Sequence, residues 1–342
     1  TWMVLIMSLT TSTIITMSST HWLLAWLGLE LNTISMLPLM MKPHHPRATE
    51  ATTKYFIIQA TAAAMILFAG TLNAWNTGQW HITNPMSTTT ATILITAIML
   101  KLGLAPVHFW YPEVLQGSTM MTAMIISTWQ KIAPLTLLYL TINHLPTNIT
   151  LSIGLTSALL GGLTGLNQTQ TRKIMAFSSI AHMGWLLTAL TINPSLATLT
   201  MLTYVMMTTT MFLSLHTAQS KTLLDLGTTW THSPTLLTMT TLSLLSLGGL
   251  PPLTGFIPKW LILKEMALTG LTPLATAMAL ASLPSLFFYT RMVYFMSMTM
   301  PPNTTNTEHK WRFKVNHMMN TTLTITLSLL LLPITPMLFL AL

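Results

Sequence analysis

Long apolar runs separated by short polar stretches follow one another along almost the whole chain. About 20 residues are needed to cross the hydrocarbon core of a bilayer as a helix. By this rule the sequence predicts about eleven transmembrane helices, near residues 2–19, 21–41, 47–75, 87–116, 118–141, 148–167, 171–190, 196–218, 235–266, 271–298 and 321–341. The predicted fold class is an all-α polytopic membrane protein.

Two of these runs are predicted to be broken helices. The run 87–116 contains Gly103-Leu104-Ala105-Pro106, followed six residues later by Pro112. The run 235–266 contains Gly249-Leu250-Pro251-Pro252, followed six residues later by Pro258. Glycine and proline interrupt helices, and the backbone groups freed at mid-membrane can hold water or bind ions.

The two broken helices also suggest an internal repeat. The offset that carries Gly103 onto Gly249 carries Trp2 onto Asn148, so helices one to five correspond to helices six to ten. Because five is odd, the second copy enters the membrane from the other side, which predicts two inverted five-helix repeats, each with one broken helix. We expect the first repeat at 1–141, the second at 142–298, and a connecting loop with a C-terminal helix at 299–342.

Charge supports a membrane location and predicts an orientation. Only 6% of the residues are charged and 51% are hydrophobic, whereas about a quarter of a soluble domain is charged. The basic residues of the predicted loops all fall on one side, namely Lys42, Arg47, Arg172, Lys173, Lys221, Lys310, Arg312 and Lys314. The positive-inside rule then puts the N-terminus on the cytoplasmic or matrix side and the C-terminus opposite. This topology accounts for the net charge of +8 without nucleic-acid binding.

The composition argues against redox chemistry in this chain. Cysteine is absent, which excludes disulfides, iron–sulfur ligation and thiol catalysis. The loop histidines lack the spacing of a zinc site. We expect no cofactor or metal here. Met is interpreted as soft core filler and Thr as bonding back to helix carbonyls, while Gly161, Gly162 and Gly165 suggest close helix packing. The segment 301–316 is expected to be an exposed connection.

Five ionisable residues fall at depth within the predicted helices, namely Glu30, Lys101, Lys131, His182 and Lys259. Each costs roughly 2.5 to 3.5 kcal/mol to insert, so residues of this kind usually mark ion pathways. Lys101 and Lys131 lie too far from the helix ends to reach the membrane surface by snorkelling. The sequence therefore predicts a proton path through Glu30, Lys101, Lys131, His182 and Lys259.

The sequence leaves alternatives open for two of these residues. Glu30 beside Lys101 would favour the ammonium, and moving or protonating Glu30 would favour the neutral amine, which describes a switch for loading and releasing a proton. The alternative is a static ion pair that only holds helices together. His182 is expected either to relay a proton or, together with Ser178, Ser179 and Thr188 on the same helix, to form hydrogen bonds to other helices.

Several motifs resemble the chain 2 family of the mitochondrial NADH:ubiquinone oxidoreductase, respiratory complex I. The resemblance covers nearly the whole chain and rests on residues 19–24, 46–51, 165–170, Lys101-Leu102-Gly103-Leu104-Ala105-Pro106-Val107-His108-Phe109-Trp110, Thr128-Trp129-Gln130-Lys131-Ile132-Ala133-Pro134, and Gly248-Gly249-Leu250-Pro251-Pro252-Leu253-Thr254-Gly255-Phe256. The wider family is similar to the Mrp-type cation/proton antiporters.

The resemblance implies a proton-translocating, antiporter-like subunit of the inner mitochondrial membrane. NADH, FMN, iron–sulfur clusters and ubiquinone would belong to other subunits. The partners implied are other membrane-arm and accessory subunits in an obligate hetero-oligomer, together with phospholipid. The family's glutamate falls on Glu30, its broken-helix lysine on Lys101, its bridging lysine on Lys131, its histidine on His182 and its second broken-helix residue on Lys259.

Two other function classes are compatible with the same residues. A free-standing cation/proton antiporter would share the buried lysines, although this chain has no second acidic ion-binding cluster. A structural membrane module would keep the packing without needing charges at depth in both halves.

Overall fold

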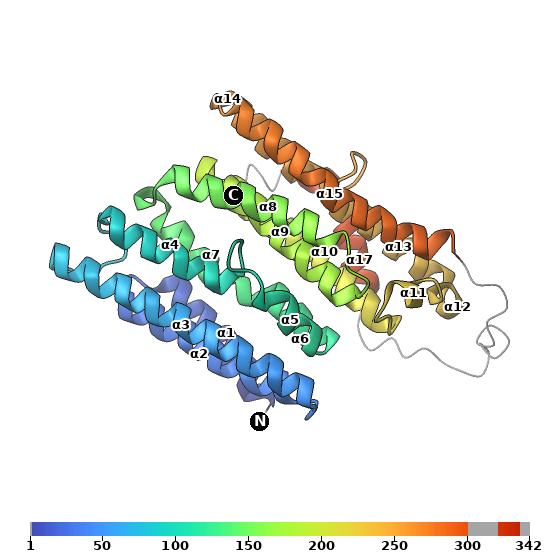
Figure 1. Cartoon of the computed structure of the whole chain (residues 1–342), viewed down its shortest axis with the longest axis horizontal. Helices are drawn as coiled ribbons and strands as arrows, with labels where there is room; N and C mark the ends of the chain where they lie inside the picture. The colour runs from blue at the N-terminus through green and yellow to red at the C-terminus, as the bar shows by residue number, and fades with distance from the viewer. Residues whose placement is uncertain (1, 300–320, 336–342) are drawn as a thin grey trace. The chain divides into compact units, whose positions relative to one another are not determined.

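The computed structural model describes residues 2–299 and 321–335 of the chain (Figure 1). Within these ranges the secondary structure is helical, with two isolated β-bridges, His21 to His81 and Gln170 to Thr222, and no strand. The chain forms two compact units, Thr1–Thr156 and Ser157–Leu342. The boundary lies within one helix, α8 (Thr147–Gly165).

The first unit begins with four helices that pack on their neighbours in chain order (Figure 1). These are α1 (Trp2–Ser18), α2 (Trp22–Met41), α3 (Pro46–Thr77) and α4 (Thr88–Leu102). Three shorter α-helices and two 3₁₀ turns follow before α8. The helices are α5 (Trp110–Gly117), α6 (Met120–Ser127) and α7 (Ile132–Thr141), and the turns are η1 (Trp129–Lys131) and η2 (Ile142–His144). α5 packs on α3, and α7 packs on α1 and α4.

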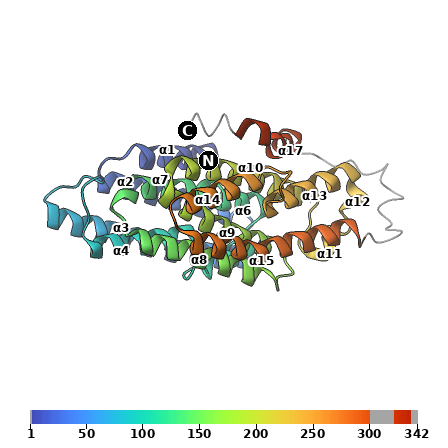
Figure 2. The same cartoon turned by 90° about the horizontal axis from the view of Figure 1, so that it is seen from above.

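The second unit contains the remaining helices, among which α13 packs on α15 (Figure 2). They are α9 (Thr171–Ile192), α10 (Pro194–Thr217), α11 (Leu223–Leu226), α12 (Thr229–His232), α13 (Pro234–Gly248), α14 (Phe256–Leu268), α15 (Thr272–Ser297), α17 (Thr321–Leu330) and η3 (Leu332–Ile334). α10 contacts α9, α13, α14 and α17, so it lies at the centre of this unit's packing.

Helix length and composition agree with a membrane protein. Five described helices are long and apolar enough to cross a bilayer, namely α2, α3, α9, α10 and α15, and four shorter apolar helices accompany them, α1, α4, α13 and α17. The count of about eleven spans stays a prediction. The expected connection at 301–316 and the end of the last span, 336–341, lie outside the described residues.

Both predicted helix breaks are confirmed. α4 ends at Leu102, Gly103 adopts a left-handed φ of 69°, and helix resumes in α5 at Trp110. α13 ends at Gly248, Gly249 has a φ of 82°, and α14 begins at Phe256. Glycine suits both positions because a Cβ disfavours positive φ.

A third interruption divides the span predicted at 118–141. α6 ends at Ser127, and Thr128, with φ −112° and ψ −70°, leads into the 3₁₀ turn that contains Lys131. Pro134 explains the break: it has no N–H to offer the carbonyl of Gln130, and its ring clashes with that carbonyl. The interpretation of 118–141 as one continuous helix was therefore wrong.

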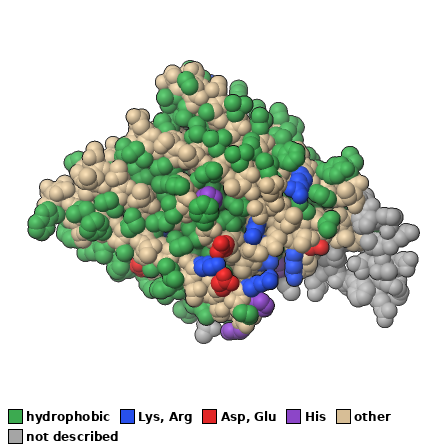
Figure 3. Space-filling model, in the orientation of Figure 1, with side chains coloured by type: hydrophobic (Ala, Val, Ile, Leu, Met, Phe, Trp, Pro, Cys, Tyr) green, Lys and Arg blue, Asp and Glu red, His purple; other side chains and the backbone are tan. Residues whose placement is uncertain are grey.

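Serine, threonine and glycine have the packing roles expected from the sequence. Serine and threonine hydroxyls bond back to carbonyls three or four residues earlier, as Thr16 does to Thr13 at 2.7 Å. A Cβ on Gly161 would lie 2.7 Å from the Ala181 nitrogen, so the α8 and α9 backbones approach closely there. Many large apolar side chains are exposed, as suits a surface that meets lipid or other helices. On the face in Figure 3 the charged side chains gather mainly in the lower part, and the upper part is largely apolar.

The loop between α10 and α13 is folded by its own hydrogen bonds. Asp225 accepts from the backbone N–H groups of Thr222 at 2.8 Å and Lys221 at 3.0 Å, and the Thr222 hydroxyl accepts from the Asp225 N–H, which is a capping box. Burial acts to raise the pKa of Asp225, but the hydrogen bonds from Thr222 and Lys221 outweigh it and hold the pKa below its usual value.

Arg291 on α15 caps the end of α8. Its Nη1 donates to the Leu166 carbonyl at 2.7 Å, a charge-assisted bond to one of the carbonyls beyond the last helical turn. Arg291→Met should lower stability by about 1.5 to 3 kcal/mol, seen as earlier loss of the assembled protein during graded heating on native gels. Arg291→Lys, which keeps a cationic donor, should lose less. Equal midpoints for Met and wild type would contradict the assignment.

Candidate functional site

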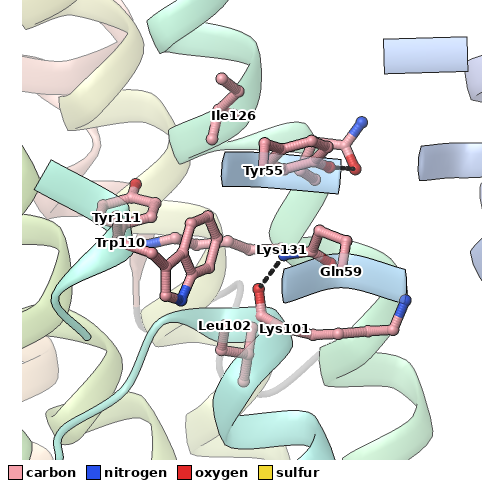
Figure 4. Close-up of a pocket in the computed structure, with 9 residues that line it drawn as sticks. Tyr55, Gln59, Lys101, Leu102, Trp110, Tyr111, Ile126 and Lys131 are labelled. Carbon is pink, nitrogen blue, oxygen red and sulfur yellow. Dashed lines mark hydrogen bonds between the residues drawn. The ribbon is translucent and has the colours of Figure 1, made fainter. Parts of the chain in front are cut away.

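In the first unit a small cavity gathers polar side chains from α3, the α4 break, α5 and the third interruption (Figure 4). Its lining is formed by Tyr55, Gln59, Lys101, Leu102, Trp110, Tyr111, Ile126, Gln130 and Lys131. Two of the five predicted site residues, Lys101 and Lys131, therefore border one cavity, because α4 and α6 are both interrupted beside it.

Lys101 occupies the last turn of α4 and is 6% exposed. Its main-chain carbonyl, which has no partner within the helix, accepts from Gln59 Nε2 at 3.3 Å. A cation in the last turn of a helix is favoured by the helix dipole. The side chain extends away from the Lys131 ammonium, so the two lysines do not point at one another (Figure 4).

Glu30 on α2 is half-buried, and its charge interacts electrostatically with Lys101. The Thr33 hydroxyl lies 3.1 Å from Glu30 Oε2 and also bonds to the Glu30 carbonyl oxygen at 2.8 Å. Among the described residues, the ion pairs within 4.0 Å are those of Lys54, so Glu30 and Lys101 act on one another over a longer distance. The direct static ion pair considered from the sequence is not formed.

Lys131 lies in the 3₁₀ turn η1 and is 3% exposed. Its Nζ lies 5.0 Å from the centre of the Tyr111 ring, a cation–π contact with the second residue of α5, the second half of the broken helix. The aromatic face provides a partly negative surface for the ammonium inside the unit. Lys131 and the α4–α5 break are thus physically linked through Tyr111.

A hydrogen-bonded row of side chains runs beside these lysines, and the sequence analysis did not predict it. Gln130 Nε2 donates to Asn32 Oδ1 at 3.1 Å, and the Tyr55 hydroxyl donates to Gln130 Oε1 at 3.4 Å. Asn32 and Tyr55 are each 2% exposed. The row joins α2, which carries Glu30, to the turn that carries Lys131. Asn32 lies two positions after Glu30, and Gln130 directly precedes Lys131. This closeness to the charged residues is the only sequence signal for the row.

Gln130→Ala should destabilise the first unit. It removes the acceptor of Tyr55 and the donor to Asn32, and an unsatisfied buried polar group costs about 1 to 3 kcal/mol. We expect less assembled protein and earlier loss on heating, followed on native gels. Gln168→Ala is the matched control, since Gln168 bonds within one helix end, to the Thr164 carbonyl at 3.3 Å. Equal loss of stability in the two variants would show that the bonds of Gln130 to Tyr55 and Asn32 stabilise the first unit no more than a single bond within one helix end does.

The second unit has a cavity of its own, which brings His182 and Lys259 together. Its lining comprises His182, Trp185, Thr200, Thr203, Tyr204, Met207, Gly255, Pro258, Lys259 and Ile262. Lys259 Nζ donates to the Gly248 carbonyl at 3.0 Å, at the C-terminal end of α13. Lys259 thus reaches back from α14 to the end of the preceding half-helix, where a cation is favoured.

His182 on α9 has an aromatic partner on each of two other helices. The Tyr289 hydroxyl lies 3.4 Å from His182 Nε2, and the Tyr204 ring centre lies 5.7 Å from the imidazole. Tyr289 also interacts with Ser178. Ser178, Ser179 and Thr188 bond back to carbonyls of their own helix. The interhelical bonding expected of His182 therefore involves Tyr289, a residue that the sequence analysis did not select.

An exposed charge cluster was also missed. Lys54 Nζ lies 2.6 Å from both Glu50 Oε1 and Glu113 Oε2 and so links α3 to α5. Exposed ion pairs of this kind contribute little to stability. No group of three or more His, Cys, Asp or Glu in the described ranges could hold a metal ion.

Each unit therefore holds a lysine at the C-terminal end of a broken half-helix, buried in the first unit and half-buried in the second, and a second titratable side chain at the same cavity. Lysine and histidine can take up and release protons, and the linings of the two cavities contain no Asp, Glu or Cys. This arrangement is suited to moving protons.

Known families and proteins are similar to this chain in sequence. The family model "NADH:quinone oxidoreductase/Mrp antiporter, TM" matches residues 19–285, and "NADH dehydrogenase subunit 2 C-terminus" matches 286–339. NADH-ubiquinone oxidoreductase chain 2 of Carassius auratus is 52% identical over 335 residues, covering 98% of this chain and 96% of that protein.

Two solved structures have the same fold. A chain of respiratory complex I from Thermus thermophilus superposes with a TM-score of 0.84 at 27% identity, covering 98% of this chain and 79% of that one. A chain of the Mrp complex from Dietzia sp. DQ12-45-1b gives a TM-score of 0.81 at 14% identity, covering 98% and 76%. The second likeness concerns the fold alone.

Proposed function

The chain belongs to the NADH-ubiquinone oxidoreductase chain 2 family, and from this we propose that it is a proton-translocating subunit in the membrane arm of that oxidoreductase. The observation that carries the proposal is the pair of lysines within the predicted spans, Lys101, which is buried, and Lys259, which is half-buried, each held at the C-terminal end of a broken half-helix. Insertion of such charges is costly without a function. Electron transfer takes place in other subunits, and this chain contributes no redox group.

The proposed path uses Glu30, Lys101, Lys131, His182 and Lys259. In the first unit, the Glu30 carboxylate favours the charged form of Lys101, and protonation or movement of Glu30 favours the neutral amine, so that Lys101 loads and releases a proton. Lys131 accepts the proton next. In the second unit, His182 and Lys259 share one cavity and complete the path. Their order across the two units follows from the proposed repeat.

The wider architecture belongs to the same proposal. About eleven spans would cross the inner mitochondrial membrane, as inverted repeats at 1–141 and 142–298 and a C-terminal part at 299–342. The loop residues Lys42, Arg47, Arg172, Lys173 and Lys221 support a matrix-side N-terminus and an intermembrane-space C-terminus. The chain would assemble only with other subunits and with phospholipid.

The test is native electrophoresis of mildly solubilised membranes. The gel is probed for this chain and stained for NADH oxidation, and the eluted band is reconstituted for proton-uptake measurements. We expect the chain to migrate with NADH-driven, uncoupler-sensitive pumping. A small band that lacks NADH oxidation would refute the proposal.

One alternative has an observation in its favour. The family model that matches residues 19–285 also covers Mrp antiporters, which favours a cation/proton antiporter that would exchange cations for protons without NADH. The same reconstituted band, supplied with a cation gradient and no NADH, distinguishes the two. The other alternative, a structural module, predicts pumping that is insensitive to loss of the buried lysines.

A further inference from the structure

The Lys259 side chain lies against the backbone at the end of α13. A Cβ built on Gly249 would lie 3.0 Å from Lys259 Nζ, 3.1 Å from its Cδ and 3.3 Å from its Cε. These atoms form the outer half of the side chain. The lysine therefore lies in tight contact with the position that the Cβ of any other residue at 249 would take.

Gly249 also creates the acceptor that the lysine uses. Its left-handed φ of 82° ends α13, and its own N–H donates to the carbonyls of Ser246 at 3.0 Å and Leu245 at 3.2 Å. The carbonyl of Gly248, the residue just before Gly249, is left for Lys259 Nζ, which donates to it at 3.0 Å. Carbonyls at a helix C-terminus carry partial negative charge and stabilise a cation.

We propose that Gly249 is a positioning residue for Lys259: with no side chain at 249, the ammonium reaches the Gly248 carbonyl. The inference rests on the proposed role of Lys259 in proton transfer. Gly249 carries no proton and acts only through the lysine. A Cβ at 249 would stand 3.0 Å from Nζ, so the lysine must shift by a few tenths of an ångström, which weakens its bond to the Gly248 carbonyl while the broken helix remains.

The experiment replaces Gly249 by alanine in the assembled complex, which is then purified and reconstituted. NADH-driven, uncoupler-sensitive proton uptake is measured against pH. With this bond weakened the ammonium releases its proton more readily, so the alkaline limb of the profile should move to lower pH, by at most about one unit. Gly270→Ala is the matched control, since Gly270 has a φ of 79° and nothing within 4 Å of its Cβ position. It has the same backbone strain, and its profile should match that of the wild type.

A second variant distinguishes backbone strain at position 249 from displacement of the Lys259 side chain. Asparagine tolerates positive φ but carries the same Cβ, so Gly249→Asn should shift the profile as alanine does. An unshifted profile in either assembled variant would overturn the proposal. So would loss of assembly in both while Gly270→Ala assembles, because Gly249 would then be a folding residue. Lys259→Met tests the underlying function separately: unchanged pumping in that variant refutes the role of Lys259 itself.

Discussion

Lys101→Met is expected to leave the protein assembled but to lower NADH-driven proton uptake by about tenfold or more, the effect of removing an essential proton-transfer group. Methionine has a similar unbranched length, fits an apolar interior and cannot carry a proton. Assembly should survive because the bond from Gln59 goes to the main-chain carbonyl of residue 101, which the substitution retains. The Glu30 carboxylate would lose the cation with which it interacts.

The measurement compares assembly on native gels, NADH oxidation and proton uptake in the same reconstituted preparation. Lys54→Met is the matched control: it removes an equal charge from an exposed cluster that borders neither cavity, and uptake should remain at the wild-type value. Full pumping by Lys101→Met would favour the structural module. Loss of assembly would show that the buried charge is needed for folding and would contradict the expected result.

Gly255→Ala is expected to prevent stable assembly. Gly255 precedes α14 and packs against the last turn of α13, where a Cβ would overlap the Ser246 carbonyl oxygen and lie 2.9 Å from its carbon. Backbone atoms cannot move aside as a flexible side chain can, so the two half-helices would have to separate. Overpacking of this kind typically costs about 1 to 3 kcal/mol, and occasionally more.

Steady-state amount of assembled protein on native gels measures this effect. Gly248→Ala provides the comparison for assembly, because its Cβ would come no closer than 3.8 Å to its nearest neighbour, Tyr289. It should assemble normally. Normal assembly of Gly255→Ala would show that the break can relax, and would contradict the tight packing of α14 on α13.

Much of the fold was predictable because its signals are local. Apolar runs long enough to span a bilayer predict helices, and Gly103 with Pro106 and Gly249 with Pro252 predict the two breaks. The ionisable residues within the predicted spans could be recognised without knowledge of their neighbours, because inserting a charge into a bilayer costs free energy. The interruption at Thr128 also had a local signal in Pro134, which was overlooked because a single proline often only bends a helix.

The sequence alone determined that the chain is helical, belongs in a membrane, breaks two helices and carries titratable groups where they are costly. Only the tertiary structure decided which groups meet. Lys101 precedes its break and Lys259 follows its own by ten positions, yet both reach the C-terminal end of a half-helix, because α14 packs back against α13. Likewise, Tyr289 reaches His182 from a helix far along the chain. Such contacts depend on packing between distant segments, which no local pattern encodes.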